Sequence, residues 1–212
     1  MLPSRIILCS IHRPVADAWH SYFDGVAGVE IACEDLFERE ADALVSPANS
    51  FGRMDGGLDE RIADLLGFAV QDAVLDMVRD RHDGELLVGL AEVIPTNHER
   101  FPYLVCAPTM RVPQDVSRTV NSYLAFRAAL RAVRDYNAEN RNPISTLLVP
   151  GLGTGNGCMP PLRAARQMRA AYDHVVFGRH PNLDISLDAG VDSLDRSQVV
   201  GREAVPPITI RP

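Results

Sequence analysis

Hydrophobic residues follow two alternating patterns along this chain: short uninterrupted runs, and longer stretches with helical spacing. The uninterrupted runs predict buried strands at residues 5–11, 29–33, 43–45, 86–95, 103–107 and 145–150. Helical spacing predicts helices over residues 14–23, 58–66, 68–81, 120–140 and 161–173. Strands that alternate with helices are typical of a three-layer α/β/α fold around a largely parallel sheet.

Two adjacent runs depart from this alternation and predict a mixed sheet. Residues 86–95 and 103–107 are joined by a short polar connection, so we expect an antiparallel hairpin there. With 212 residues, 46% of them hydrophobic, the chain can bury one sizeable core, and we expect a single domain over 1–212. Beyond residue 177 the pattern is irregular, with a possible strand at 184–187.

Composition and charge exclude several classes of protein. A formal net charge of −7 disfavours non-specific binding to nucleic acid, which depends on neutralising phosphates. The four cysteines are far apart and form no CxxC pair, so neither a disulfide scaffold nor a metal site is expected. Cys9, Cys33 and Cys106 lie in apolar runs and are expected to be buried thiols. No apolar run is long enough to span a membrane, so we expect a cytoplasmic protein without a membrane partner.

The stretch 43–59 joins a predicted strand to a predicted helix through residues that favour turns. It carries a short amide, Asn49, the adjacent glycines Gly56 and Gly57, and an acid, Asp59. Ligands of α/β proteins bind at the carboxyl ends of the strands, so this loop is a candidate binding segment. An ordinary strand-to-helix connection is the alternative.

A second glycine-rich loop, residues 151–157, follows the last strong strand. Its glycines occupy every second position, which lets backbone N–H groups approach an anion closely. The spacing is neither a Walker A loop nor the GxGxxG fingerprint of dinucleotide-binding folds. Two glycine loops that each open a helix suit a diphosphate held between them. A tight turn required only for packing is the alternative.

Taken in order, these segments resemble the macro domain, the ADP-ribose-binding module. The family pattern V-N-A-A-N is similar to residues 45–49, and the family's glycine run followed by a hydrophobe and Asp is similar to 56–59. Its Gly-Asp-Ile is matched by residues 34–36, and its Ser-Thr-Gly loop by 153–155. The resemblance implies a core at about 29–177, an N-terminal strand–helix addition and a C-terminal extension.

The resemblance implies a role for each matching residue. Asp35, with Leu36 beside it, would bind the adenine. Asn49 would hold hydroxyls of the distal ribose, and Asp59 would position or activate water in a hydrolysing member. Backbone groups of the two loops would bind the diphosphate; these are Gly56, Gly57, Gly153, Thr154, Gly155, Asn156 and Gly157. Without the resemblance, Asp35 is a turn acid, Asn49 an Asx turn and Asp59 a first-turn helix acid.

This chain departs from the family pattern at several positions. Residues 51–55 replace part of the family's glycine run, which leaves open whether Asp55 takes the role of Asp59. Gly157 stands where an aromatic residue is usual, and Cys106 where a histidine is common. The aromatic residue that often covers adenine at the chain end has no counterpart here.

We therefore expect an ADP-ribose-binding protein that hydrolyses an ADP-ribosyl or O-acetyl-ADP-ribose linkage and needs neither metal nor cofactor. Its partner would be ADP-ribose or an ADP-ribosylated substrate. A non-catalytic reader of ADP-ribose is the alternative. A dinucleotide enzyme of the NAD type is disfavoured because GxGxxG is absent.

Overall fold

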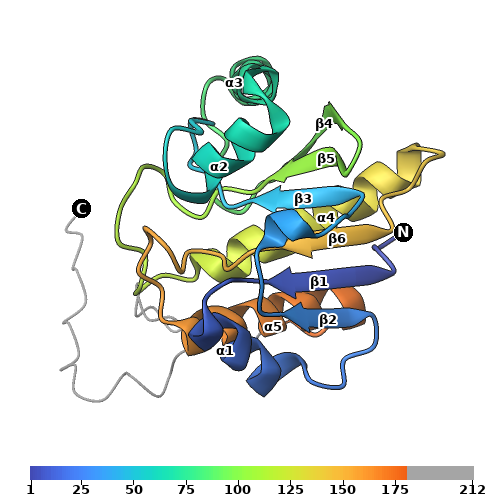
Figure 1. The fold of residues 1–212 in the computed structure, drawn as a ribbon, viewed down its shortest axis with the longest axis vertical. Coiled ribbons are helices and arrows are strands. Elements are labelled where there is room, and N and C mark those ends of the chain that lie inside the picture. The colour runs from blue at the N-terminus through green and yellow to red at the C-terminus, as the bar shows by residue number, and fades with distance from the viewer. Residues whose placement is uncertain (181–212) are drawn as a thin grey trace, which may run out of the picture.

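The computed structural model describes residues 1–180, which form a six-stranded sheet with helices on both faces (Figure 1). The strands are β1 (Arg5–Cys9), β2 (Val29–Ala32), β3 (Ala43–Ser46), β4 (Glu92–His98), β5 (Phe101–Cys106) and β6 (Thr146–Val149). The helices are α1 (Arg13–Phe23), α2 (Gly57–Leu66), α3 (Phe68–His82), α4 (Asn121–Glu139) and α5 (Pro161–Phe177), with a short 3₁₀ helix η1 (Leu36–Glu38). The strand expected at 184–187 and the C-terminal extension lie outside the described residues.

The strands are ordered β2-β1-β6-β3-β5-β4 across the sheet. β4 pairs antiparallel with β5, and the other neighbouring pairs are parallel. The expected mixed, largely parallel α/β/α architecture is confirmed. β1 lies inside the sheet, where Ile6 pairs with Val29 of β2 and Arg5 with Thr146 of β6.

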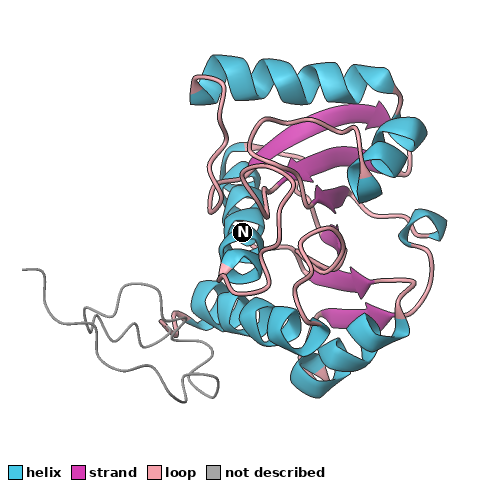
Figure 2. Ribbon diagram, turned by 90° about the vertical axis from the view of Figure 1, so that its left-hand side faces the viewer, coloured by secondary structure: helices cyan, strands magenta, loops and turns pink. Residues whose placement is uncertain are grey.

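Both faces of the sheet are buried, because successive strand residues point to opposite sides. Ile6 and Leu8 of β1 belong to the core beneath α1, α4 and α5, whereas Ile7 and Cys9 belong to the core beneath α2 and α3. Figure 2 shows helices surrounding the strands. Strands of a sheet that is covered on both faces consist of continuous apolar runs, and for this reason these strands could be predicted from the sequence.

Two local expectations are wrong. β4 begins at Glu92 instead of residue 86: Leu87 is 56% exposed, and Gly89 has a φ of +103°, which interrupts an extended chain. The hairpin with β5 is nevertheless present. Cys9 and Cys106 are buried as expected, but Cys33 is exposed because β2 ends one residue before it.

Candidate functional site

Loops at the carboxyl ends of the parallel strands enclose a cavity of about 360 Å³, a size suited to a small-molecule ligand. These strand ends lie on the left in Figure 1. The strands lie side by side in the order β2-β1-β6-β3-β5, so the loops that follow them lie side by side along the cavity in the same order. The residues that line the cavity from these loops include Leu36 after β2, Ser10 to His12 after β1, Pro150, Gly151 and Gly153 to Gly157 after β6, Pro47 to Asn49 after β3, and Thr109 and Met110 after β5.

The structure gathers nearly all of the predicted site residues around this one cavity. Those that line it are Leu36, Asn49, Gly56, Gly57, Asp59, Gly153, Thr154, Gly155, Asn156 and Gly157. Asp35 is the exception, because it lies beside the cavity next to Leu36 and does not itself line it. The two glycine loops and Asp59 are therefore close in space, although about a hundred residues separate them in sequence.

Helix α2 begins at the cavity with an open N-terminus. Gly56 precedes its first residue, Gly57, and no side chain of the described chain caps it. The first N–H groups of a helix lack intrahelical acceptors, and together with the helix dipole they favour an anion. This end of α2 can therefore accept a phosphate without displacing a capping side chain.

Three of the four glycines in the second loop are favoured by the loop's own packing or backbone conformation. A Cβ atom at Gly157 would lie 2.6 Å from the carbonyl oxygen of Gly153, and one at Gly151 would lie 2.3 Å from Oγ1 of Thr154. Gly153 has a φ of +74°, which favours glycine. At Gly155, by contrast, a Cβ would meet nothing within 4 Å, and this residue lines the cavity. The packing alternative thus accounts for three glycines and leaves Gly155 facing open space.

The two glycine loops approach each other directly. The side-chain amide nitrogen of Asn156 lies 3.3 Å from the position that a Cβ of Gly57 would take. Gly57 also has a φ of +63°. A larger residue at position 57 would therefore be strained and would crowd the second loop. This contact brings the backbone donors of both loops to the same part of the cavity, as binding of one diphosphate requires.

Asp59 lies in the first turn of α2 and is only 7% exposed. Its Oδ1 accepts a hydrogen bond of 2.7 Å from the hydroxyl of Ser46, the last residue of β3. Burial raises the pKa of Asp59 to about 6, and the Ser46 hydrogen bond partly offsets this rise. No ion pair to Asp59 is found within residues 1–180. A carboxyl group with this pKa exists in both protonation states near neutral pH.

Cys106 is buried near Asp59 at the end of β5. Burial raises the pKa of its thiol well above the usual range, and the negative charge of Asp59 raises it further. Cys106 therefore stays a neutral thiol at physiological pH. It cannot replace a histidine in proton transfer.

Asp35 is held by partners on both of its oxygen atoms. Oδ1 accepts from the backbone N–H of Phe37 at 3.0 Å, which caps η1, and Oδ2 accepts from Arg61 of α2 at 2.7 Å. The Phe37 hydrogen bond, followed by the Arg61 contacts, holds the pKa of Asp35 below its usual value. Arg61 also lies over the Phe37 ring, with 4.6 Å from its guanidinium carbon to the ring centroid.

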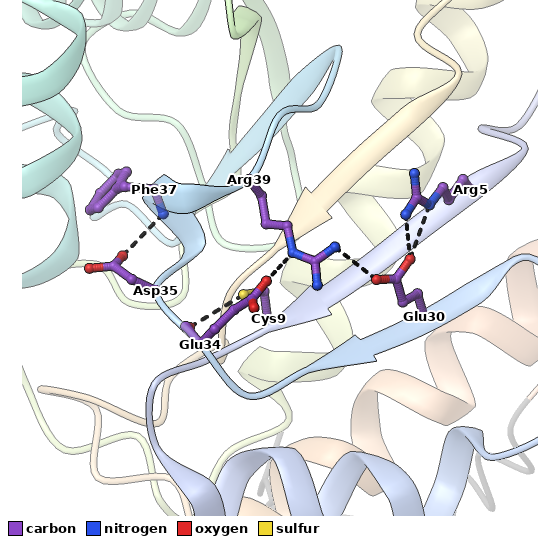
Figure 3. Close-up of polar contacts among 7 residues, drawn as sticks. All are labelled: Arg5, Cys9, Glu30, Glu34, Asp35, Phe37 and Arg39. Atoms are coloured by element: carbon purple, nitrogen blue, oxygen red, sulfur yellow. Dashed lines mark hydrogen bonds and ion pairs between the residues drawn. The ribbon is translucent and has the colours of Figure 1, made fainter.

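Ion pairs anchor the turn that carries Asp35 (Figure 3). Arg39 pairs with both Glu30 and Glu34, and Glu30 also pairs with Arg5 of β1. The thiol of Cys9 donates to the carbonyl of Glu34 at 3.4 Å. The acidic side chains of the turn are thus engaged with arginines, and the turn is tied to the end of β1.

The side chain of Asn49 bonds within its own loop. Its Oδ1 accepts from the N–H groups of Phe51 and Arg53, and its Nδ2 donates to the carbonyl of Arg53 at 2.7 Å. This is the Asx-turn alternative. Asn49 lines the cavity, and its side chain stabilises the part of the wall that carries Arg53 and Asp55. A hydrogen bond from this side chain to a ribose hydroxyl stays a prediction.

Several residues that the motifs did not identify also belong to this site. Arg61 lines the cavity one helical turn after Leu58, and the spacing along α2 is the signal that could have found it. Ser46 supports Asp59 from the adjacent strand, which no sequence spacing indicates. Ile11 and His12 come from the β1–α1 loop, whose position depends on where β1 enters the sheet.

Residues 1–180 contain no group of three or more His, Cys, Asp or Glu side chains placed to hold a metal ion. Over the same part of the chain, none of the helices has both the length and the apolar character needed to cross a membrane.

Comparisons with known proteins identify a matching family and similar folds. The family model described as the macro domain matches residues 45–168. An uncharacterized protein of Aquifex aeolicus is 29% identical over 140 residues, which cover 66% of this chain and 78% of that protein. The macrodomain of Mycobacterium tuberculosis DarG has a similar structure, with a TM-score of 0.55 and 21% identity, covering 67% of this chain and 88% of that one.

Thermosipho africanus DarTG in complex with ADP-ribose is a further structural neighbour. Its TM-score is 0.53 at 20% identity, and the similarity covers 65% of this chain and 36% of that chain. The family match begins at residue 45, so β1, α1 and β2 precede it. Part of the cavity wall therefore comes from residues outside the match.

Proposed function

Because this chain belongs to the macro domain family, we propose that its cavity binds ADP-ribose and that Asp59 takes part in hydrolysing an ADP-ribosyl linkage. The observation that carries the proposal is the order of chemical groups along the cavity. An acidic turn follows β2, the glycine loop follows β6, and the buried Asp59 lies beside β3. This is the order of base, diphosphate and distal ribose in an extended ADP-ribose.

Each segment offers chemistry that suits its part of the ligand. At the base end, the oxygens of Asp35 each accept one bond, and a carboxylate oxygen can accept another from an exocyclic amine. In the middle, the open N-terminus of α2 and the cavity-facing Gly155 offer backbone donors for phosphate oxygens. Such contacts support binding of the diphosphate by a chain with a net charge of −7, because backbone donors need no basic side chain.

At the distal end, Asp59 is suited to act on water. A carboxylate with a pKa of about 6 can orient a water molecule and accept its proton as the water attacks the anomeric carbon. Where a macromolecule is attached at the anomeric carbon, the attack would break the bond between that carbon and the attached group, and the group would leave with a proton and free ADP-ribose. An acetyl ester of a ribose hydroxyl would instead be attacked by the same water at its carbonyl carbon, which releases acetate and ADP-ribose. A non-catalytic reader is the second candidate, and the inward hydrogen bonds of Asn49 favour it.

Calorimetric titration with ADP-ribose tests the binding proposal. We expect a dissociation constant in the micromolar range, which corresponds to about −8 kcal/mol. Gly155→Glu should abolish binding without unfolding the protein, because the new side chain would enter open space and its charge would repel phosphate. Gly155→Ala is the matched control and should bind far better than Gly155→Glu. Normal binding by a folded Gly155→Glu variant would place the diphosphate elsewhere.

Release of ADP-ribose from a modified substrate under single-turnover conditions separates the enzyme from the reader. Release by the parent protein supports hydrolysis, and its rate identifies the preferred linkage when several substrates are compared. Tight binding with no release from a protein-linked, nucleic-acid-linked or acetylated substrate favours the reader.

A further inference from the structure

The loop between β1 and α1 occupies a distinctive place in the cavity wall. Ser10, Ile11 and His12 line the cavity although they precede the family match at residues 45–168. β1 lies between β2 and β6, so this loop lies between the Asp35 turn and the glycine loop. It therefore borders the part of the cavity where a base attached to the bound diphosphate would lie.

This loop is fixed in position by its own hydrogen bonds. The N–H of Ser10 donates to the carbonyl of Ala32 in β2 at 3.1 Å, and the Ser10 hydroxyl accepts from the N–H of His12 at 3.1 Å. Pro14, the second residue of α1, follows shortly afterwards and restricts the backbone further. A wall that is ordered before the ligand arrives costs little entropy when the ligand binds.

Ile11 is a large hydrophobic residue that this ordered loop leaves exposed. Its exposed fraction is 53%, while Cys9, two residues earlier at the end of β1, is completely buried. An apolar side chain that lines a cavity and is open to solvent gains from contact with an apolar ligand surface. The face of a purine ring is such a surface, whereas a phosphate or a ribose hydroxyl gains nothing from it.

We propose that Ile11 contacts the face of the adenine ring, so that the N-terminal strand–helix unit completes the nucleoside end of the site. This inference rests on the proposed function. The ligand it concerns is a purine nucleoside 5′-diphosphate, alone or extended by the distal ribose. Asp35 and Ile11 then have separate tasks: Asp35 binds the edge of the base, and Ile11 covers its face.

Titration of Ile11→Ser with ADP and with ADP-ribose tests this assignment. We expect both affinities to fall by the same factor, about 10-fold, because both ligands carry the base. Ile11→Trp should restore or exceed the parent affinity, because an aromatic ring stacks on adenine. Leu162→Ser is the matched control: Leu162 of α5 is 59% exposed and does not line the cavity, so both affinities should stay at the parent value.

The results of these titrations distinguish a failure of the Ile11 assignment from a failure of the proposed function. Parent affinity in Ile11→Ser for both ligands overturns the Ile11 assignment and leaves the proposed function standing. A loss for ADP-ribose with unchanged affinity for ADP also overturns it, because Ile11 would then contact the distal ribose. If the parent protein binds neither ligand, the proposed function fails and the assignment fails with it.

Discussion

Asp35 and Asp59 are the same residue type near opposite ends of one cavity, yet their surroundings affect them in opposite ways. Asp35 is at the surface, where a backbone N–H and an arginine hold its pKa below the usual value. Asp59 is buried with a single hydroxyl donor, Ser46, and its pKa rises to about 6. Burial without a cation raises a carboxyl pKa, and hydrogen bonds or a cation at the surface lower it.

This difference assigns the two carboxyl groups to different kinds of chemistry. Asp35 stays charged over the physiological pH range and suits recognition, where a permanent acceptor is useful. Asp59 changes protonation state near neutral pH and suits proton transfer. The following variants test whether the contrast is functional, from the largest expected effect to the smallest.

Asp59→Asn should lower the single-turnover rate of ADP-ribose release by about 100-fold or more, because an amide cannot accept the proton of the attacking water. ADP-ribose affinity should change much less, since this contribution belongs to the transition state. Asp55→Asn is the matched control, because Asp55 also lines the cavity. Loss of release in the Asp55 variant alone would transfer the role to Asp55.

Asp59→Asn should also stabilise the protein at neutral pH. The folded pKa of about 6 exceeds the ordinary aspartate pKa of 3.8, so the native state binds more protons between these pH values and loses stability as pH rises through them. At pH 7.5 we expect the variant to be more stable by roughly 1–3 kcal/mol, and near pH 3.5 the gain should vanish. Urea unfolding at both pH values measures this. An equal gain in the free energy of unfolding at both pH values would show that ionisation of Asp59 is not the cause.

Asp35→Ala should weaken ADP-ribose binding by about 10-fold and reduce the preference for adenine, because a charge-assisted hydrogen bond is lost. Asp35→Asn is the informative companion, since its side-chain oxygen can still accept from the N–H of Phe37 and cap η1. Competition between ADP-ribose and analogues with other bases measures the preference. Unchanged selectivity in both variants would mean that Asp35 only caps the turn.

Ser46→Ala should have the smallest effect and act through Asp59. Its hydroxyl stabilises the charged carboxylate, so its loss should raise the pKa of Asp59 further, by about one unit or less. We expect the pH–rate profile to shift upwards and the rate at pH 7 to fall a few-fold. Ser46→Thr keeps the hydroxyl and should restore the parent profile. A lower rate with an unshifted profile would contradict this positioning role.

The helices were predictable from the sequence because local side chains determine which face of a helix is buried. In α3, for example, Val70, Val74 and Met77 recur at helical spacing, and all three are buried. The place of β1 was not predictable, because nothing in its apolar run indicates that its partners are β2 and β6. The run at residues 86–90 was misleading because strand formation there depends on backbone geometry, and Gly89 has a positive φ.

Motif order located the candidate site well, but it could not determine hydrogen bonding. Asn49 and Asp59 were both found at the cavity, as their positions after β3 indicated. Whether the amide of Asn49 bonds inside its loop or to a ligand depends on the turn that the chain adopts. The burial that raises the pKa of Asp59 likewise comes from surrounding segments, which no single motif contains.

The interior position of β1 has a consequence for how this protein folds. Arg5 of β1 pairs with Thr146 of β6, so β1 gains this partner only after β6 has been synthesised. Pairing between residues so distant in sequence requires the closure of a long loop, which slows folding. Until β6 has been synthesised, β1 has an unpaired edge and an apolar side chain at each position from Ile6 to Leu8. Nascent chains that end before β6 should therefore be prone to aggregation.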